Sequence, residues 1–185
     1  MMSKRQVMIF IACSVDGYIA TKDNDISWLD MVDREGEDYG YFDFIKNVDT
    51  VLLGRKTYDK VLTLSDTFWH KDRKTIVLSN SKTGSDENVT FFNGPITELI
   101  ADLQKQEGKN IFCDGGSEII FELMKHDLID RFIISVIPVF LGDGVSLFKP
   151  GRHIQRLELK RSMSFPSGLV QLWYEKMNQN KDLLL

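Results

Sequence analysis

The chain has 185 residues, which is typical of a single domain with a sizeable apolar core, and its 43% hydrophobic and 27% charged residues are ordinary for a soluble globular protein. The formal net charge of −4 argues against a general nucleic-acid-binding protein, because such proteins need a basic surface to displace counterions from the phosphates. The chain has only two cysteines and no apolar stretch long enough to span a membrane, so we expect a cytoplasmic protein without a disulfide framework or a membrane partner.

Short apolar runs rich in branched residues alternate along the chain with segments that carry apolar residues at helical spacing. We expect strands at 7–13, 50–53, 75–78, 89–92, 111–113 and 130–137. Helices are expected at 39–47, from 54 towards 62, at 96–106 and at 117–126. Two further runs, 153–163 and 169–174, flank a turn at 166–168 and predict an antiparallel hairpin.

This succession of elements predicts an α/β fold. Its centre would be a mostly parallel mixed sheet, flanked by helices on both faces and finished by the C-terminal antiparallel hairpin. No linker or repeat interrupts the pattern, so residues 1–177 are expected to form a single domain, with 178–185 as a frayed tail. Ligands of such sheets bind beyond the carboxyl ends of the strands, which directs attention to the residues that follow each strand.

The stretch 110–124 carries the clearest strand-to-helix junction of the chain. An apolar run meets Asp114, then Gly115 and Gly116, and a helix is expected to begin at Ser117. A glycine pair lets the backbone approach a ligand closely, and the free N–H groups of a helix start attract a phosphate. The same pair also fits a simple tight turn, and the stretch alone does not decide between the two.

Small and polar residues also follow three other expected strands. They are Asp16-Gly17, the segment Gly54–Thr57 and the segment Ser79–Lys82. If these strand ends share one edge of the sheet, two helix starts and the guanidinium of Arg55 would converge on a phosphate-rich ligand such as a dinucleotide. The simpler alternatives are solvated charges after the second strand and plain turns after the other two.

Other kinds of chemistry find little support in the sequence. The three histidines show no metal-ligand spacing, so no metal site is expected and each is interpreted as a surface or core residue. There is no GxSxG motif, and neither cysteine has an electropositive neighbourhood. Chemistry carried by a bound cofactor is therefore favoured over covalent catalysis.

Five segments together resemble the dihydrofolate-reductase-like superfamily: IACSVDGYIA, SWLD, VLLGRKTYDKV, TIVLSNS and FCDGGSEII. A sixth, LIDRFIISVIPVFLGDGVSLF, is characteristic of its riboflavin-biosynthesis branch. From 7 to 175 the chain is similar to the C-terminal reductase domain of the bifunctional deaminase–reductase, as a single-domain member. The resemblance implies a dihydrofolate-reductase-like fold and an NADPH-dependent oxidoreductase. Its substrate would be a pterin- or pyrimidine-like heterocycle, as for 5-amino-6-(5-phosphoribosylamino)uracil reductase.

The resemblance also implies where NADPH would bind. Ala12 would contact the nicotinamide carboxamide, and Ile19 and Ala20 would lie under the nicotinamide ring. The other implied contacts are Gly54, Arg55, Lys56 and Thr57 for the phosphates, Ser79 and Asn80 for the adenosine 2′-phosphate, and Gly115, Gly116, Ser117 and Glu118 for the pyrophosphate.

On the substrate side, the resemblance gives fewer matches. Trp28 matches the tryptophan of the mobile loop in dihydrofolate reductases, and Asp114 matches an acidic substrate contact of the riboflavin-type enzymes. Asp16 and Tyr41 complete the candidate substrate contacts, and the candidate catalytic residues are Asp114, Trp28 and Asp33.

The acid that a dihydrofolate reductase needs is placed differently by two routes. Counting forward from Trp28 gives Asp33, whereas aligning back from the next helix gives Tyr41, with Asp38 one turn earlier. The riboflavin-pathway pattern also differs, since Tyr18 stands where those enzymes usually have arginine, and GRKTYDKV replaces a Gly/Thr-rich segment.

Two alternatives to the heterocycle reductase remain open. One is dihydrofolate reductase activity, which requires a working acid near Trp28. The other is a non-catalytic NADP(H)-binding module that kept the fold and lost turnover. We also expect a homodimer, because the late hairpin offers edge strands that a twofold contact can cover.

Overall fold

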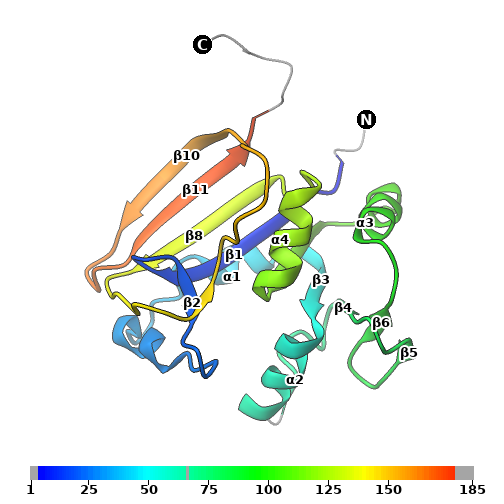
Figure 1. The fold of residues 1–185 in the computed structure, drawn as a ribbon, viewed down its shortest axis with the longest axis horizontal. Helices are drawn as coiled ribbons and strands as arrows, with labels where there is room; N and C mark the ends of the chain where they lie inside the picture. The colour runs from blue at the N-terminus through cyan, green and yellow to red at the C-terminus, as the bar shows by residue number, and fades with distance from the viewer. Residues whose placement is uncertain (1–3, 66, 178–185) are drawn as a thin grey trace.

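The structure, a computed structural model, describes residues 4–65 and 67–177 (Figure 1), so the expected tail at 178–185 lies outside the described residues. Its centre is a nine-stranded sheet with the order β10-β11-β8-β1-β7-β3-β4-β6-β5. A second sheet of two short strands, β2 and β9, lies beside it. No helix within the described ranges combines the length and apolarity needed to cross a membrane.

The elements have the following bounds. The strands of the large sheet are β1 (Val7–Ser14), β3 (Val48–Gly54), β4 (Lys74–Leu78), β5 (Gly84–Ser85), β6 (Thr90–Phe92), β7 (Asn110–Gly115), β8 (Arg131–Ile137), β10 (Leu157–Ser164) and β11 (Val170–Lys176). The small sheet pairs β2 (Tyr18–Ala20) with β9 (Val145–Ser146). The helices are the 3-10 helix η1 (Ser27–Val32), α1 (Tyr41–Ile45), α2 (Arg55–Leu64), α3 (Ile96–Lys105) and α4 (Ser117–Lys125).

The large sheet is mixed and mostly parallel, which confirms the predicted fold class. Six strands run parallel to one another: β8, β1, β7, β3, β4 and β6. The predicted C-terminal hairpin is β10–β11, and β11 joins the sheet antiparallel to β8. The small sheet was not foreseen, because β9 is only two residues long and pairs with a segment far earlier in the chain.

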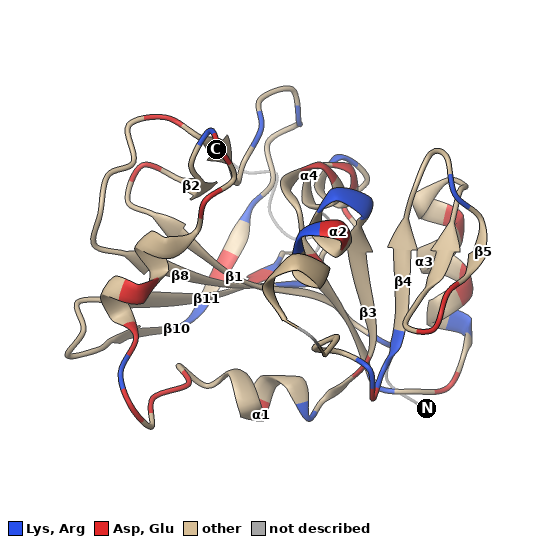
Figure 2. Ribbon diagram, turned by 90° about the horizontal axis from the view of Figure 1, so that it is seen from below, with Lys and Arg blue, Asp and Glu red and all other residues tan. Residues whose placement is uncertain are grey.

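Apolar side chains on successive residues of the central strands face opposite sides of the sheet. In β1, Val7 and Ile9 join a buried cluster with α3 and α4, whereas Met8 joins a second cluster with α1 and α2. The helices therefore cover both faces, and α1 and α4 lie on opposite sides of the sheet (Figure 2). Burial on both faces explains why these strands have continuous apolar runs.

Phe112 lies in the middle of β7 and is 1% exposed. We expect Phe112→Ala to lower the free energy of unfolding by about 3–5 kcal/mol, because the substitution leaves a cavity that close-packed neighbours fill only in part. Urea denaturation followed by circular dichroism measures this change. The matched control is Phe42→Ala on α1, where the ring is 66% exposed and the expected change is within about 0.5 kcal/mol. Equal losses in both variants would contradict this assignment of the core.

Candidate functional site

A long cleft runs along the carboxyl edge of the parallel strands, with a volume of about 1690 Å³. The small β2–β9 sheet contributes residues to one side of it and α2 to the other. All the residues that the resemblance implied for the cofactor line this cleft: Ala12, Ile19, Ala20, Gly54, Arg55, Lys56, Thr57, Ser79, Asn80, Gly115, Gly116, Ser117 and Glu118. The strand ends at Gly54–Thr57, Ser79–Asn80 and Asp114–Ser117 therefore meet at one edge as expected, whereas Asp16-Gly17 does not line the cleft.

The order of the strands sets the order of these residues along the cleft. From β1 to β6 the neighbouring strands are β1, β7, β3, β4 and β6. Ala12 on β1 is therefore at one end, the junctions after β7 and β3 are in the middle, and Ser79 after β4 is towards the other end. This is the sequence of nicotinamide, phosphate and adenosine contacts that the resemblance implied.

The two central junctions pack directly against each other. A Cβ atom on Gly54 would lie 3.2 Å from Cγ1 of Ile119 and 3.4 Å from the backbone nitrogen of Gly116. A Cβ atom on Gly116 would lie 3.0 Å from Oγ1 of Thr57. The peptide bond between Gly115 and Gly116 is cis. The glycines are needed because the end of β3 and the start of α4 approach within backbone contact.

Both helix starts at these junctions have glycine as the N-cap and lack a side-chain cap bond. The first N–H groups of α2 and α4 are thus left for another acceptor at the positive end of each helix dipole. Backbone N–H groups arranged in this way bind phosphate oxygens. The middle of the cleft is therefore suited to a pyrophosphate.

Cations lie beside these helix starts. The Arg55 Nε donates a hydrogen bond to Oδ1 of Asp59 at 2.7 Å, and its guanidinium lies 5.7 Å from the centre of the Phe91 ring. The ammonium of Lys82 lies 5.3 Å from the same ring centre. Both cations therefore lie over the Phe91 ring of β6, the strand beside β4, as expected of cation–π contacts.

The Ser79 side chain itself makes a turn. Its buried Oγ accepts hydrogen bonds from the backbone N–H groups of Ser81, at 3.3 Å, and Lys82, at 3.0 Å. The plain-turn interpretation therefore describes the side chain of Ser79, and after this turn the Lys82 ammonium lies over the Phe91 ring. Asn80 is exposed at the tip.

Asp114, on β7, lies beside the β1 end of the cleft. Because β7 pairs in parallel with β1 and Cys113 is opposite Ile9, Asp114 comes level with Phe10, two residues before Ala12. Its carboxylate is 25% exposed, and Oδ2 lies 2.8 Å from Nε2 of His70. The contact joins two residues that are 44 positions apart in the chain.

Tyr41 lies near this carboxylate although it is not one of the residues lining the cleft. Burial, followed by the negative charge of Asp114, raises the pKa of Tyr41 to about 12. Its phenol stays protonated at ordinary pH, with the Tyr41 ring packed edge-on against Phe10 at 5.5 Å between centres.

Three other sequence candidates do not reach the cleft. Trp28 is buried in a small apolar cluster with Val32, because η1 turns these two side chains inward. The same turn leaves Asp33 exposed to solvent just after η1. Asp16 holds the 139–144 loop, since its carboxylate accepts hydrogen bonds from Ser14 Oγ and from the N–H groups of residues 141 and 142.

The two thiols are unsuited to nucleophilic chemistry. Burial raises the pKa of Cys13 to about 11 and that of Cys113 to about 12, so both remain protonated near neutral pH. Across residues 4–65 and 67–177, no three His, Cys, Asp or Glu side chains gather where a metal ion could bind.

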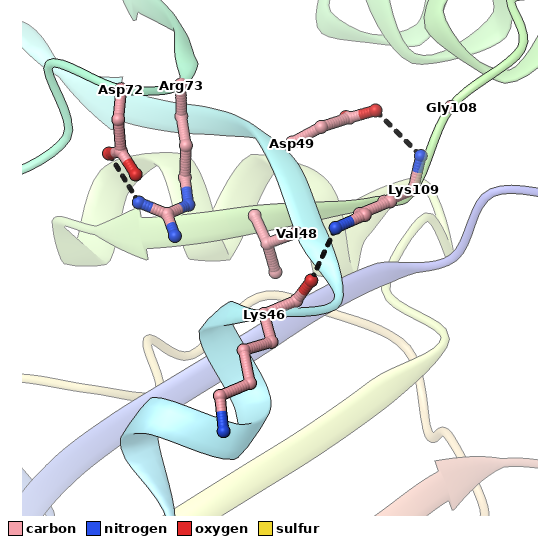
Figure 3. A pocket seen from close by; sticks show the side chains of 7 residues that line it. All are labelled: Lys46, Val48, Asp49, Asp72, Arg73, Gly108 and Lys109. Atoms are coloured by element: carbon pink, nitrogen blue, oxygen red, sulfur yellow. Dashed lines mark hydrogen bonds and ion pairs between the residues drawn. The ribbon is translucent and has the colours of Figure 1, made fainter.

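A second hollow of about 480 Å³ lies at the opposite, amino edge of the sheet (Figure 3). Its polar groups are largely engaged with one another. Lys109 donates its backbone N–H to Asp49 at 2.7 Å and its ammonium to the carbonyl of Lys46 at 2.8 Å, and Arg73 pairs with Asp72 at 2.5 Å. The carboxyl-edge cleft is therefore the stronger candidate for a functional site.

Sequence reasoning treated 65–73 as a polar loop and missed its contribution. Phe68 and His70 are buried, and Trp69 is 51% exposed and lines the cleft. The only signal in the sequence was the run of aromatic residues within an otherwise polar segment. Lys149, which also lines the cleft and pairs with Glu118, gave no local signal at all.

Comparison with known proteins gives a consistent result. A model of the RibD C-terminal domain family matches residues 5–171. The Bacillus subtilis (strain 168) protein YwjB, which is uncharacterized, is 43% identical over 172 residues, covering 92% of this chain and 98% of YwjB.

Two solved structures extend the comparison. A Shewanella sp. PV-4 protein, whose name proposes a role in riboflavin biosynthesis, matches with a TM-score of 0.85 at 32% identity, over 94% of this chain and 99% of that one. The dihydrofolate reductase of Enterococcus faecalis, solved with NADP(H), matches with a TM-score of 0.66 at 18% identity, over 94% of this chain and 97% of that one. The second likeness shows a shared fold.

Gly54→Ala tests the packing of the two central junctions. The backbone of Gly54 has φ −74° and ψ 147°, which suits alanine, so the added methyl acts only through crowding. We expect a loss of about 1–3 kcal/mol in the free energy of unfolding, measured by urea denaturation. The loss should be smaller when Ile119→Ala removes the nearest side-chain atom, and equal losses in both backgrounds would contradict the proposed contact.

Proposed function

The chain belongs to the RibD C-terminal domain family, and on this premise we propose that it is an NADPH-dependent reductase acting on a flat, nitrogen-rich heterocycle. The family is one of NADPH-dependent reductases. The observation that carries the proposal is the order of candidate contacts along the cleft, from Ala12 through the glycine junctions to Ser79. The substrates that fit best are pyrimidine-like riboflavin precursors or pterin-like compounds.

The residues present fit the cofactor. Two helix starts without side-chain caps offer N–H groups in the middle of the cleft. A side chain on Gly54 or Gly116 would crowd the contact between these two helix starts. Arg55 lines the cleft, and Lys82 shares the Phe91 ring with it, so these two cations would favour a cofactor with an additional phosphate near them.

The substrate would lie beside Ala12, at the end of the cleft where Asp114 is exposed. A carboxylate accepts hydrogen bonds only, so Asp114 would select a ring edge that carries N–H or amino groups. Leu29 and Trp69 provide apolar walls for a flat ring. Bound NADPH would supply the hydride, and the protein would supply position and electrostatics.

The proton balance of the reaction leaves Asp114 an orienting role. Reduction of a ring C=N bond requires one proton in addition to the hydride. Asp114 is the carboxyl group on β7 next to the implied nicotinamide contacts on β1, so we assign it to orienting the ring through N–H or amino groups beside the reduced bond, while the proton for the imine nitrogen would come from solvent.

The alternative of dihydrofolate reductase activity is not favoured by the geometry. That activity needs an acid near Trp28, and Asp33 is exposed on the surface outside the cleft. The alternative of a non-catalytic NADP(H)-binding module shares the cofactor half of the proposal. It predicts tight NADPH binding with no oxidation of NADPH across a panel of pyrimidines and pterins.

Titration with NADPH, followed by the change in its fluorescence, tests the cofactor half of the proposal. We expect Arg55→Gln to weaken NADPH binding about tenfold, because one charge-assisted contact to a phosphate is lost. The matched control is Lys46→Gln, which removes the same charge at the opposite edge of the sheet and should leave the affinity unchanged. Absence of NADPH binding to the unmodified protein at millimolar concentration would refute the cofactor assignment.

We further propose that the protein is a homodimer joined through the β10 edge. This strand ends the large sheet, and Leu159 on it is 51% exposed. Size exclusion with light scattering should give twice the mass of one chain. Leu159→Glu should shift the protein to monomer, whereas Leu62→Glu, at a residue 46% exposed on α2, should leave the dimer intact. A monomeric unmodified protein would contradict the proposal.

A further inference from the structure

The segment between α2 and β4 places a buried imidazole against the one carboxylate assigned to the substrate. His70 is 3% exposed, and its Nε2 lies 2.8 Å from Oδ2 of Asp114. An ionised carboxylate has no proton to give, so in this pair the imidazole donates from Nε2 and Asp114 accepts. One of the two carboxylate oxygens is therefore already occupied before any substrate arrives.

The imidazole is itself held in place. Its ring packs edge-on against Phe68, at 5.9 Å between centres, and against Phe112, at 6.1 Å. Phe68 is in turn edge-on to Tyr58 at 5.5 Å, within the apolar cluster under α2. The backbone carbonyl of His70 accepts the N–H of Arg73 at 2.9 Å. These contacts fix the ring from the core side, so the direction of its N–H is set by packing.

The other carboxylate oxygen is left for a ligand. Within the described ranges, Oδ1 of Asp114 accepts no hydrogen bond, and Asp114 lines the cleft. With Oδ2 fixed by His70, rotation of the carboxylate is restrained and Oδ1 keeps one orientation. An acceptor with a fixed direction binds a donor better than one that must be ordered first, because less conformational freedom is lost on binding.

We propose that His70 is a positioning residue, which locks Asp114 so that its free oxygen faces the N–H or amino edge of the heterocycle. The inference rests on the proposed function, because it concerns the substrate half of the same cleft. It makes the substrate class more specific. The bound edge of the ring must offer a hydrogen-bond donor. A ring edge that offers only acceptors would be repelled, because the carboxylate of Asp114 is fixed by His70 and cannot rotate to avoid it.

The test uses 5,6-diaminouracil as a donor-bearing probe, titrated by calorimetry into the full-length protein saturated with NADP⁺. His70→Met keeps a similar volume and removes the donor, and we expect it to weaken binding of the probe about tenfold. His70→Gln retains an N–H donor at a comparable reach and should recover most of the affinity. His153→Gln, at an exposed histidine paired with Asp127, is the matched control and should bind like the unmodified protein.

A double-mutant cycle separates positioning from general stability. In an Asp114→Asn background, His70→Met should have little further effect on probe binding, because the group that it positions is already changed. The affinity for NADP⁺ should stay within about twofold in the variants changed only at His70, because His70 does not line the cleft.

The possible failures are distinct. If NADP⁺ does not bind to the unmodified protein, the proposed function fails. Three results would overturn the positioning role while the cofactor assignment stands. The first is that NADP⁺ binds and the probe does not. The others are that His70→Met leaves the probe affinity unchanged, or that it lowers this affinity equally in the Asp114→Asn background. His70→Gln carries the test if His70→Met does not fold, because loss of probe binding in this variant would also overturn the role.

Discussion

The backbone contact between two strand-to-helix junctions is the constraint on which the rest of the site depends. Gly54 and Gly116 approach so closely that a methyl group on either would meet atoms within 3.0–3.2 Å. This approach brings the starts of α2 and α4 side by side and directs both sets of free N–H groups into one cleft. It also requires β3 and β7 to be neighbours, which fixes the middle of the sheet.

The cleft has two halves that are built differently. In the middle, the contacts offered to a ligand come from backbone N–H groups, so they depend on the position of the backbone and little on the identity of the side chains. At the β1 end they come from side chains supplied by separate elements, with Asp114 from β7 and Trp69 from the α2–β4 segment. The first half suits a cofactor shared by many reductases, and the second suits a particular substrate.

Local patterns in the sequence were enough for the fold class and for the junctions at the carboxyl edge of the sheet. Continuous apolar runs marked the central strands because these are buried on both faces, and glycine after a strand marked a junction because a side chain there would crowd the neighbouring junction. The pairing of His70 with Asp114 could not be read in this way, since the two residues lie 44 positions apart and meet only in the folded chain. The same applies to Asp33, where counting from Trp28 gave a residue that the turn of η1 leaves facing solvent.

The α2–β4 segment carries Trp69 and His70 without contributing to the junctions that would hold the cofactor. Its anchor is the aromatic packing of Phe68 beneath α2. Under the proposed function, exchange of the residues beside that anchor would alter which ring binds, while the glycine junctions and the sheet would be preserved. In such a scaffold, substitutions in the α2–β4 segment alone would produce new substrate preferences. Two relatives with the same cofactor site would then differ in the substrate that they reduce.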